Sequence, residues 1–466
     1  MAGFVQEHEM SDITFNSLQR TYESFGYTVD PNGVSANSLV GDLESAKNHN
    51  GITVNDYKLK KNERRKRNPK GDPSNESFKG PWAGFEGDVL DMPARTAEQD
   101  NYVPDPENQF DKTKLNDEHK SIEETSIFHG KQQLDYLGRS FLHPPNDVGI
   151  ELRGEVGHRE NFIPKNLIHT WTGHTKAVNV IQFFPKSAHL IISGSMDHKI
   201  KIWDVYNERN CKRTYMGHSK GIKDLSFNNS GTHFLSASYD KWIKHWDTET
   251  GQCIGRFTTK KIPYCVTFNP HPDKQHVFLT GCQDKKVYQF DIRSGEVVQQ
   301  YDQHNGAVNT ITFIDDDRRF ITTSDDKSVR CWEVDIPVVI KYINDPDMHS
   351  MPAVSKSWDD QWLACQSLDN KIVIYSAKER LKLNRKKTFT GHLVAGFNCK
   401  PGWSPDGRFI MSGDSEGKMN FWDWKSCKLF KKFKAHEGVV TSCLWHPYES
   451  SKVATCSVDG TIKYWD

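Results

Sequence analysis

Short runs in which apolar and polar residues alternate fill the chain from about residue 166 onward, and turn signals such as Pro405-Asp406-Gly407 interrupt them. Alternation with a period of two predicts half-buried β-strands, and short strands between regular turns are typical of an all-β domain. Residues 1 to 125 lack this periodicity and are rich in Asn, Asp, Glu, Ser, Pro and Gly. Such a composition favours a segment that orders only against partners, so the pattern divides the chain near Lys165.

The strand-rich region repeats itself seven times. The repeated segments are SMDHKIKIWD, SYDKWIKHWD, CQDKKVYQFD, SDDKSVRCWE, SLDNKIVIYS, DSEGKMNFWD and SVDGTIKYWD. Their last aromatic residues, Trp203, Trp246, Phe290, Trp332, Tyr375, Trp422 and Trp465, follow one another at intervals of 42 to 47 residues. An Asp or Glu stands six positions before each aromatic, and several repeats have a Gly-His pair upstream. A fixed period of this length indicates a repeat architecture in which each unit is one small antiparallel sheet.

At these residues the sequence resembles the WD-repeat family, and the resemblance implies a seven-bladed β-propeller with four strands per blade. The chain stops at Asp466, directly after the aromatic of the seventh repeat, so another segment must supply the last strand of that blade. Residues 166 to 173, NLIHTWTG, match the segments that precede later repeats. We therefore predict that 166–173 closes the ring, since a ring of blades leaves no free edge only when closed.

The resemblance also implies a role for the repeated His, Asp and Trp residues. In this family they form a buried hydrogen-bonded network with a Ser or Thr, because a buried carboxylate needs donors and a neutral imidazole can link it to a hydroxyl. The complete set recurs in repeats 1, 2, 4 and 7 as His174, Asp197, Trp203, His218, Asp240, Trp246, His304, Asp326, Trp332, His436, Asp459 and Trp465. A Ser-His-Asp hydrolase is the alternative, but a catalytic triad is a single site and this set recurs around the ring. We expect no enzyme activity, and assign no catalytic, cofactor-binding or metal-binding residue and no cofactor.

Repeats 3, 5 and 6 depart from this set at Phe290, Tyr375 and Glu416. We expect these three blades to be held more by packing, or by a partner.

Composition sharpens the division of the chain. The 466 residues include 61 Lys plus Arg and 61 Asp plus Glu, but residues 1–165 carry about −8 and residues 166–466 about +8. The second part holds all ten Cys and every Trp except Trp82, which places the core there and predicts ten small buried thiols. A mean hydropathy of −0.72, and a start, MAGFVQEHEM, without signal-peptide features, predict an intracellular protein without a membrane span.

The turns that carry the repeated Asp also carry lysines in six blades. They are Lys199, Lys241, Lys285, Lys286, Lys327, Lys371 and Lys418. A ring of cations suits phosphates or an acidic protein surface, and the alternative is that these lysines are simply solvated. No aromatic RNA-reading motif accompanies them, so we expect any RNA contact to involve the backbone.

Two further segments are candidate contacts. AKERLKLNRKKTF, residues 377–389, is expected to form a basic loop into an outer strand, which either binds a partner or protects a sheet edge. FDIRSG, from Phe290 to Gly295, approximates the WD-x-Arg pattern of substrate receptors in cullin-based ubiquitin ligases, with Arg293 as the residue to test. That receptor role is the alternative function.

Upstream of the propeller we expect a disordered acidic arm, 1–77, and an extended partner-docking segment, 78–165. A run of Lys and Arg at 58–70 suggests a nuclear import signal, or else a solvated charge run. Large apolar side chains stand out in the docking segment because they are costly to leave in water, which suggests anchors for other proteins. The candidate anchors are Gly80, Pro81, Trp82, Phe85, Tyr136 and Phe141.

Residues 78–466 are also similar to a narrower family, the WD-repeat splicing factors of the second catalytic step. The similarity rests on GPW at 80–82, on DYLGRSFLHPPNDVG at 135–149 and on loop stretches such as DPDMHSMPAV. It implies a non-enzymatic nuclear protein that joins the spliceosome around its catalytic stages and supports exon ligation. The expected partners are spliceosomal proteins and the small nuclear ribonucleoprotein core, with contacts to the RNA backbone and with neither a membrane nor a small-molecule substrate.

Overall fold

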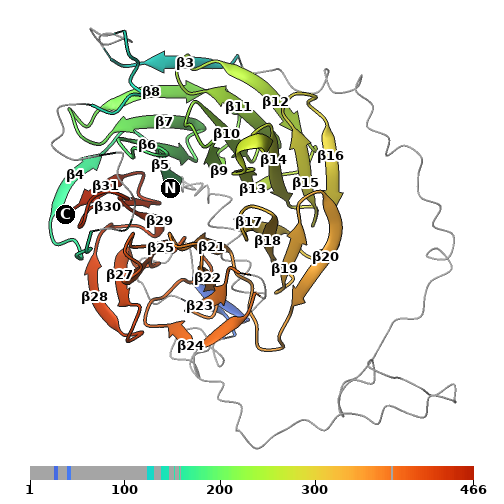
Figure 1. Ribbon diagram of the computed structural model, residues 1–466. Helices are drawn as coiled ribbons and strands as arrows, with labels where there is room; N and C mark the ends of the chain where they lie inside the picture. The colour runs from blue at the N-terminus through green and yellow to red at the C-terminus, as the bar shows by residue number, and fades with distance from the viewer. Residues whose placement is uncertain are drawn as a thin grey trace, which may run out of the picture. The chain divides into compact units, whose positions relative to one another are not determined.

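The computed structural model describes residues 26–29, 39–42, 123–130, 138–145, 152, 157, 159–378 and 381–466. Seven antiparallel sheets surround a central axis (Figure 1), as the repeats predict. In blades 1 to 6 the first strand lies innermost, and the polypeptide then runs outward over the next three strands. Within the described residues, no helix has the length and apolar character needed to cross a membrane.

The first four blades follow one another directly along the chain. Blade 1 contains β5 (Val178–Phe183), β6 (Leu190–Ser195), β7 (Lys199–Asp204) and β8 (Cys211–Met216), and blade 2 contains β9 (Ile222–Phe227), β10 (His233–Ser238), β11 (Trp242–Asp247) and β12 (Cys253–Thr258). Blade 3 contains β13 (Pro263–Phe268), β14 (Val277–Cys282), β15 (Val287–Asp291) and β16 (Val297–Tyr301), and blade 4 contains β17 (Val308–Ile314), β18 (Arg319–Ser324), β19 (Val329–Glu333) and β20 (Ile336–Ile343). A short 3-10 turn, η4 (Pro272–Lys274), precedes β14.

The last three blades complete the ring. Blade 5 contains β21 (Ala353–Lys356), β22 (Trp362–Ser367), β23 (Lys371–Ser376) and β24 (Leu383–Phe389), and blade 6 contains β25 (Gly402–Trp403), β26 (Phe409–Gly413), β27 (Lys418–Asp423) and β28 (Leu429–Lys434). Blade 7 contains β29 (Val440–Trp445), β30 (Val453–Ser457), β31 (Ile462–Trp465) and, from the start of the domain, β4 (Leu167–Trp171). Two further strands, β1 (Tyr27–Val29) and β2 (Leu39–Gly41), pair only with each other.

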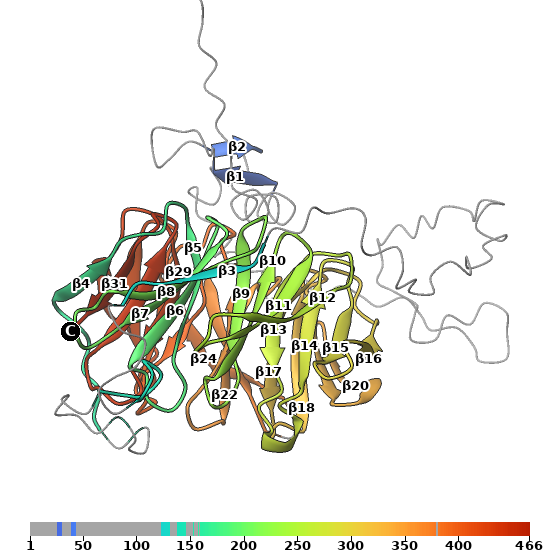
Figure 2. The ribbon, with the colours of Figure 1, turned by 90° about the horizontal axis from the view of Figure 1, so that it is seen from above.

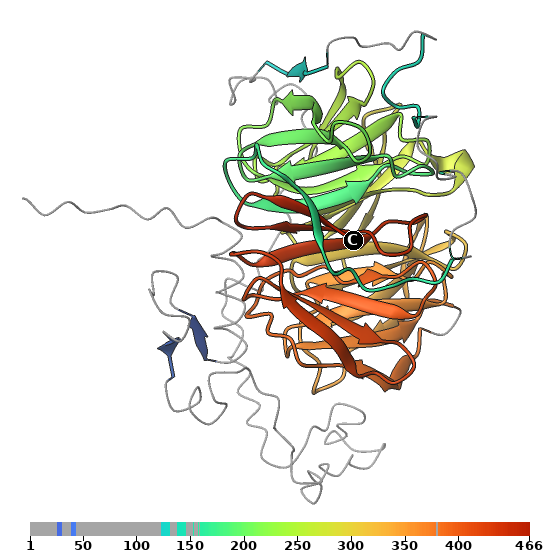
Figure 3. The same ribbon diagram turned by 90° about the vertical axis from the view of Figure 1, so that its left-hand side faces the viewer.

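The ring closes through β4, which lies in the segment that the sequence analysis assigns to this task. Strand β4 pairs antiparallel with β31, with Trp171 opposite Ile462, and Figure 3 shows the green segment passing beside the red strands of blade 7. The amides of Lys165 and Asn166 both donate to the carbonyl of Asp466 at 2.6 Å. Blade 7 is therefore built from two segments that lie far apart in the sequence.

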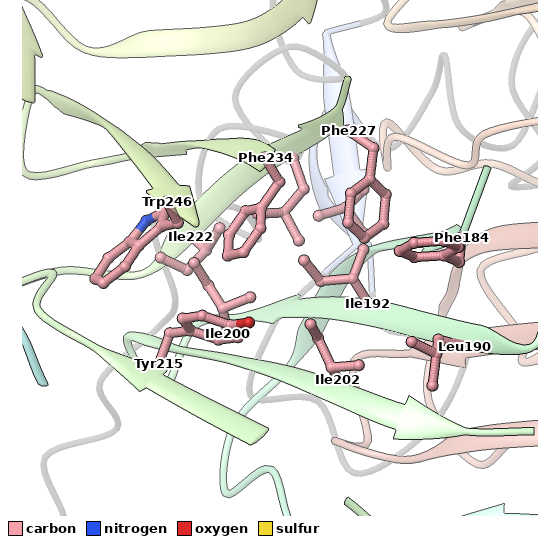
Figure 4. Close-up of a cluster of buried hydrophobic side chains, with 12 residues drawn as sticks. Phe184, Leu190, Ile192, Ile200, Ile202, Tyr215, Ile222, Phe227, Phe234 and Trp246 are labelled. Atoms are coloured by element: carbon pink, nitrogen blue, oxygen red, sulfur yellow. The ribbon is translucent and has the colours of Figure 1, made fainter. Parts of the chain in front are cut away.

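The core consists of apolar clusters between neighbouring blades. Between blades 1 and 2, for example, Ile192 and Ile202 face Ile222, Phe234 and Trp246 (Figure 4). Equivalent clusters fill the other six interfaces, because each blade has two apolar faces and can bury them only against its neighbours.

All ten Cys are free thiols, but the prediction that all are buried is wrong for three of them. Cys211, Cys253 and Cys427 are half-buried, because they lie at the start of an outer strand or in the turn before one, where only one side of the sheet is covered.

A segment upstream of the propeller adds a fifth strand to blade 1. We call residues 123–130 and 138–145 the N-terminal strap. Its strand β3 (Thr125–Phe128) pairs antiparallel with β8, as Figure 2 shows along the outer side of the blade. The Glu124 carboxylate accepts from Lys244 Nζ at 2.6 Å and also pairs with Arg256, so the strap reaches blade 2. Lys244 in turn donates to the carbonyl of Gly217 at 2.6 Å.

Arg213 holds the strap at its other end. The side chain is buried, and its guanidinium lies 5.3 Å from the ring centre of Phe128 and 5.9 Å from that of Phe141. It donates to Ser126 Oγ at 2.9 Å and to the carbonyl of Thr250 at 2.8 Å. The strap thus supplies the carboxylate partner of Lys244, and a hydroxyl and two aromatic rings beside Arg213.

Glu124→Ala is expected to lower the free energy of unfolding by about 3 kcal/mol, because it leaves the Lys244 ammonium buried without its carboxylate. Adding Lys244→Met should recover most of that loss, since an apolar side chain of similar length needs no partner. Glu123→Ala, which alters an exposed neighbour, serves as the matched control. Urea denaturation measures all four proteins, and equal stability of Glu124→Ala and the parent would contradict the docked strap.

Candidate interaction surfaces

Four blades contain the same chain of hydrogen bonds between a Trp, a hydroxyl, a His and an Asp. In blade 4, Trp332 Nε1 donates to Thr322 Oγ1 at 2.9 Å, that hydroxyl lies 2.7 Å from His304 Nε2, and His304 Nδ1 lies 2.9 Å from Asp326 Oδ2. Because a carboxylate only accepts, the imidazole donates from Nδ1 and accepts the hydroxyl proton at Nε2. The other three chains are Trp203-Ser193-His174-Asp197, Trp246-Ser236-His218-Asp240 and Trp465-Thr455-His436-Asp459.

These chains hold the turns of the propeller together. In blade 1, Asp197 accepts from the backbone amides of Thr175 and Lys199 as well as from His174. Burial alone raises the pKa of the Asp197 carboxyl, but the hydrogen bond from His174 and those from the amides outweigh it and hold the pKa below its usual value. The hydroxyl between Trp203 and His174 belongs to the fully buried Ser193, so a substrate has no access to it. This geometry suits a structural network and does not suit a hydrolase.

Blades 3, 5 and 6 use other polar contacts. In blade 3, Tyr288 Oη donates to Asp284 at 2.7 Å, and Tyr301 Oη donates to Gln289 at 2.9 Å. His392, which precedes blade 6, lies with Nε2 2.9 Å from Gln366 Oε1 of blade 5, so this contact joins two blades. The altered repeats therefore contain other hydrogen bonds in place of the usual His-Asp-Trp set.

The seven predicted lysines lie in the turns between the second and third strands, or at the first position of the third strand. The residue after each repeated Asp or Glu has a positive φ in every blade, from 60° to 80°. This residue is His198, Lys241, Lys285, Lys327, Asn370, Gly417 or Gly460. Gly and Asn adopt that conformation readily, whereas a lysine there costs roughly 1 kcal/mol. Blades 2, 3 and 4 hold a lysine in a conformation that favours glycine.

Ion pairs divide the seven lysines into two groups. Lys371 Nζ lies 2.8 Å from Asp369, and Lys418 pairs with Glu416 within its own turn. Within the described residues the remaining five form no ion pair, and we call them the basic arc. The basic arc comprises Lys199, Lys241, Lys285, Lys286 and Lys327 of blades 1 to 4. Within the described residues, the lysines of the predicted ring that form no ion pair thus lie on blades 1 to 4.

The basic segment 377–389 follows β23 and leads, as expected, into an outer strand. That strand, β24, begins at Leu383 and takes up more than half of the segment. Lys387 Nζ donates to the backbone carbonyl of Lys425 at 3.1 Å, while Lys382 and Arg385 are exposed. In the FDIRSG turn, Arg293 is exposed and its amide donates to Asp291 at 2.8 Å.

Of the candidate anchors, the structure places only Phe141. Its ring centre lies 5.8 Å from that of Phe128, and its carbonyl oxygen lies 3.1 Å from His189 Nε2, so it contacts blade 1 of its own chain. The other five candidate anchors lie outside the described residues, as does the basic run at 58–70; these anchors are Gly80, Pro81, Trp82, Phe85 and Tyr136.

Sequence reasoning missed the strap contacts of Glu124, Arg213 and Lys244. The alternation in TSIF, residues 125–128, was the one available signal. Among the described residues, no group of His, Cys, Asp and Glu could hold a metal ion.

Comparison with known proteins matches the repeats to a family. The WD domain, G-beta repeat family matches residues 165–204, 209–247, 295–333, 383–423 and 427–466. The unmatched stretches contain the repeats that end in Phe290 and Tyr375, where the usual set is altered.

Relatives extend the likeness to the whole chain. Pre-mRNA-processing factor 17 of Homo sapiens is 50% identical over 100% of this chain and 81% of its own length. The protein of the same name from Saccharomyces cerevisiae is 37% identical over 86% of this chain and 88% of its own length. WD repeat-containing protein 25 of Mus musculus is 24% identical over 66% of this chain and 59% of its own. Identity of this extent, on a seven-bladed propeller, shows that the chain belongs to the pre-mRNA-processing factor 17 family of WD-repeat proteins.

Proposed function

We propose that the chain is a non-enzymatic component of the spliceosome, that it scaffolds the catalytic-stage complex, and that it supports the second transesterification, in which the exons are joined. One observation carries this proposal: 50% identity over 100% of the chain with proteins named as pre-mRNA-processing factors. The nucleus is the location that such a role requires. The alternative of a ubiquitin-ligase receptor rests on the short FDIRSG turn and is not favoured.

The buried polar networks support a scaffold rather than an enzyme. Each His, hydroxyl and carboxylate of the four chains is engaged within its blade, and their positions repeat around the ring. RNA and its bound metal ions would then perform the chemistry. The protein would favour the second-step arrangement by binding it more tightly than the preceding one, since a ligand shifts an equilibrium only by its differential affinity.

Two parts of the chain would share this task. The propeller offers the basic arc, and we propose that the arc meets RNA phosphates, whose binding weakens with added salt. Residues 78–165 would supply the extended contacts to spliceosomal proteins and the ribonucleoprotein core, with Gly80, Pro81, Trp82, Phe85 and Tyr136 as anchors. The strap supports this division because it fastens the extended part to blade 2 at Glu124 and to blade 1 at Phe141.

A splicing extract depleted of this protein is expected to accumulate cleaved first exon and lariat intermediate and to make little joined mRNA. The first step would proceed because its complex does not depend on the contacts that the protein makes preferentially with the second-step arrangement. The second step would be slow because that arrangement would lack those contacts. Gel separation of a labelled pre-mRNA measures each species over time. Add-back of the recombinant full chain should restore the joined product.

A mock-depleted extract controls for the procedure. Accumulation of unreacted pre-mRNA, or an unchanged yield of mRNA, would contradict the proposed step. As an internal comparison, a Trp82→Ala/Tyr136→Ala chain should melt like the parent yet restore less product, because it lacks two proposed anchors. Full rescue by that variant would remove these residues from the proposal without affecting the assignment to the second step.

A further inference from the structure

The outer strand of blade 4 exposes a row of apolar side chains. Strand β20 is an edge of its sheet, and no described strand pairs with its outer side. Along it, Val338, Ile340 and Tyr342 are 59%, 48% and 52% exposed. Half-buried residues alternate with these three along β20, and register shifts beside Trp332 interrupt the strict alternation of faces, so the three form an exposed row along the strand without sharing one face. A long apolar edge is a template for pairing with another extended chain, and proteins usually protect such edges with charge or cover them.

A groove with basic walls lies beside this edge. It has a volume of about 480 Å³ between β20 and β24, and residues of both strands line it. Tyr342 and Leu383 supply apolar walls, while Lys382 and Arg385 supply exposed cations that form no ion pair within the described residues. Asp345 is the one carboxylate of the lining, so the groove has a positive balance. Its lining suits an occupant that combines apolar side chains with carboxylates.

Blade 1 shows how such an edge is filled in this molecule. There β3 covers β8, and the residues immediately before β3 are Glu123 and Glu124. The Glu124 carboxylate reaches Lys244 and Arg256 of blade 2. A fifth strand with an acidic start thus covers the edge of one blade and pairs with cations of the next. Blade 4 likewise has an edge strand that no described strand covers, and the cations Lys382 and Arg385 of blade 5 lie beside it.

We propose that β20 and the groove beside it bind an extended acidic segment of a partner protein, which adds a fifth strand to blade 4. Backbone hydrogen bonds to the β20 edge give the affinity, and apolar side chains of the segment cover the exposed Val338, Ile340 and Tyr342. The carboxylates of the segment face Lys382 and Arg385. This inference rests on the geometry of blades 1, 4 and 5 and is independent of the splicing role.

Fluorescence anisotropy with the full chain tests the proposal. The probe is a labelled peptide with two glutamates ahead of alternating valines and threonines, after the pattern of Glu123–Phe128. Saturable binding is expected, and Ile340→Lys should weaken it at least about tenfold by placing a charge on the apolar row. The double variant Lys382→Glu/Arg385→Glu should weaken it to a similar extent by reversing the charge of the groove.

Matched controls use equally exposed positions on other blades. Ile254→Lys lies on the outer strand of blade 2, where Ile254 is 55% exposed, and Lys428→Glu lies just before the outer strand of blade 6. Neither should change the affinity, and thermal melting shows that each variant is folded. Failure of the peptide to saturate, or equal affinity for the parent and both test variants, would overturn the proposal. A dimer in analytical ultracentrifugation that Ile340→Lys converts to a monomer would also overturn it, because the edge would then belong to a second copy of the chain.

Discussion

A chain that lacks residues 166–173 is expected to show no cooperative unfolding transition. Strand β4 supplies the outer strand of blade 7, and without it β31 becomes an unprotected edge. Trp171, which is 2% exposed and packs against Trp203 of blade 1 and Tyr464 of blade 7, is also lost. The deletion thus opens the ring at the interface of its first and last blades. Circular dichroism during heating and during urea titration measures the result.

Two single substitutions on β4 compare the stability lost with a buried side chain and with an exposed one. Trp171→Ala should cost about 3–5 kcal/mol, the usual cost of removing a buried Trp side chain. Leu167→Ala, on the same strand but 46% exposed, should cost less than about 0.5 kcal/mol. A truncated domain that melts cooperatively near the temperature of the full chain would refute closure by β4.

The free energy of unfolding is expected to fall steeply as the pH drops below about 6.5. Burial lowers the pKa of His189 and His245 to about 4, and that of His392 and His446 to about 3. The unfolded chain binds protons at these imidazoles near pH 6.5, whereas the folded chain does not, so acid favours unfolding. The stability that comes from keeping these imidazoles neutral is therefore fully present above pH 6.5 and is lost as the pH falls toward 3 or 4. At pH 5 each histidine has lowered the free energy of unfolding by about 2 kcal/mol relative to neutral pH.

Urea denaturation at several pH values between 7.5 and 5 measures this dependence. His446→Gln should reduce the slope of the free energy of unfolding against pH, because one fewer proton is taken up on unfolding. His446 is fully buried beside Tyr206. The expectation fails if stability is the same at pH 7.5 and pH 5.

The ring could be predicted from the sequence because its determinants recur. Seven aromatic positions at nearly equal spacing and the acidic residue before each define the blades, and the match of 166–173 to later segments identifies the closing strand. The four polar chains could be expected from the resemblance to the WD-repeat family, because the residue types that the resemblance implies return in the same order in four repeats. Repetition supplies many independent observations of one pattern.

The strap could not be predicted in this way, because its pairing occurs once and joins distant residues. Strand β3 has only four residues, too few for a periodic signal, and its partner β8 lies more than 80 residues away. Its position depends on Arg213 and Lys244, which look like ordinary strand residues in the sequence. The exposed row on β20 could not be predicted for a related reason. Alternation predicts a strand but does not indicate whether another strand covers its outer edge.

The two-segment construction of blade 7 has a consequence for synthesis of the protein. Strand β4 leaves the ribosome early, yet its partner β31 spans Ile462–Trp465. At about 5–20 residues per second, β4 waits roughly 15 to 60 s for that partner. During this interval Trp171 has no blade to enter, so the nascent chain presents an apolar strand to solvent until translation reaches the last blade.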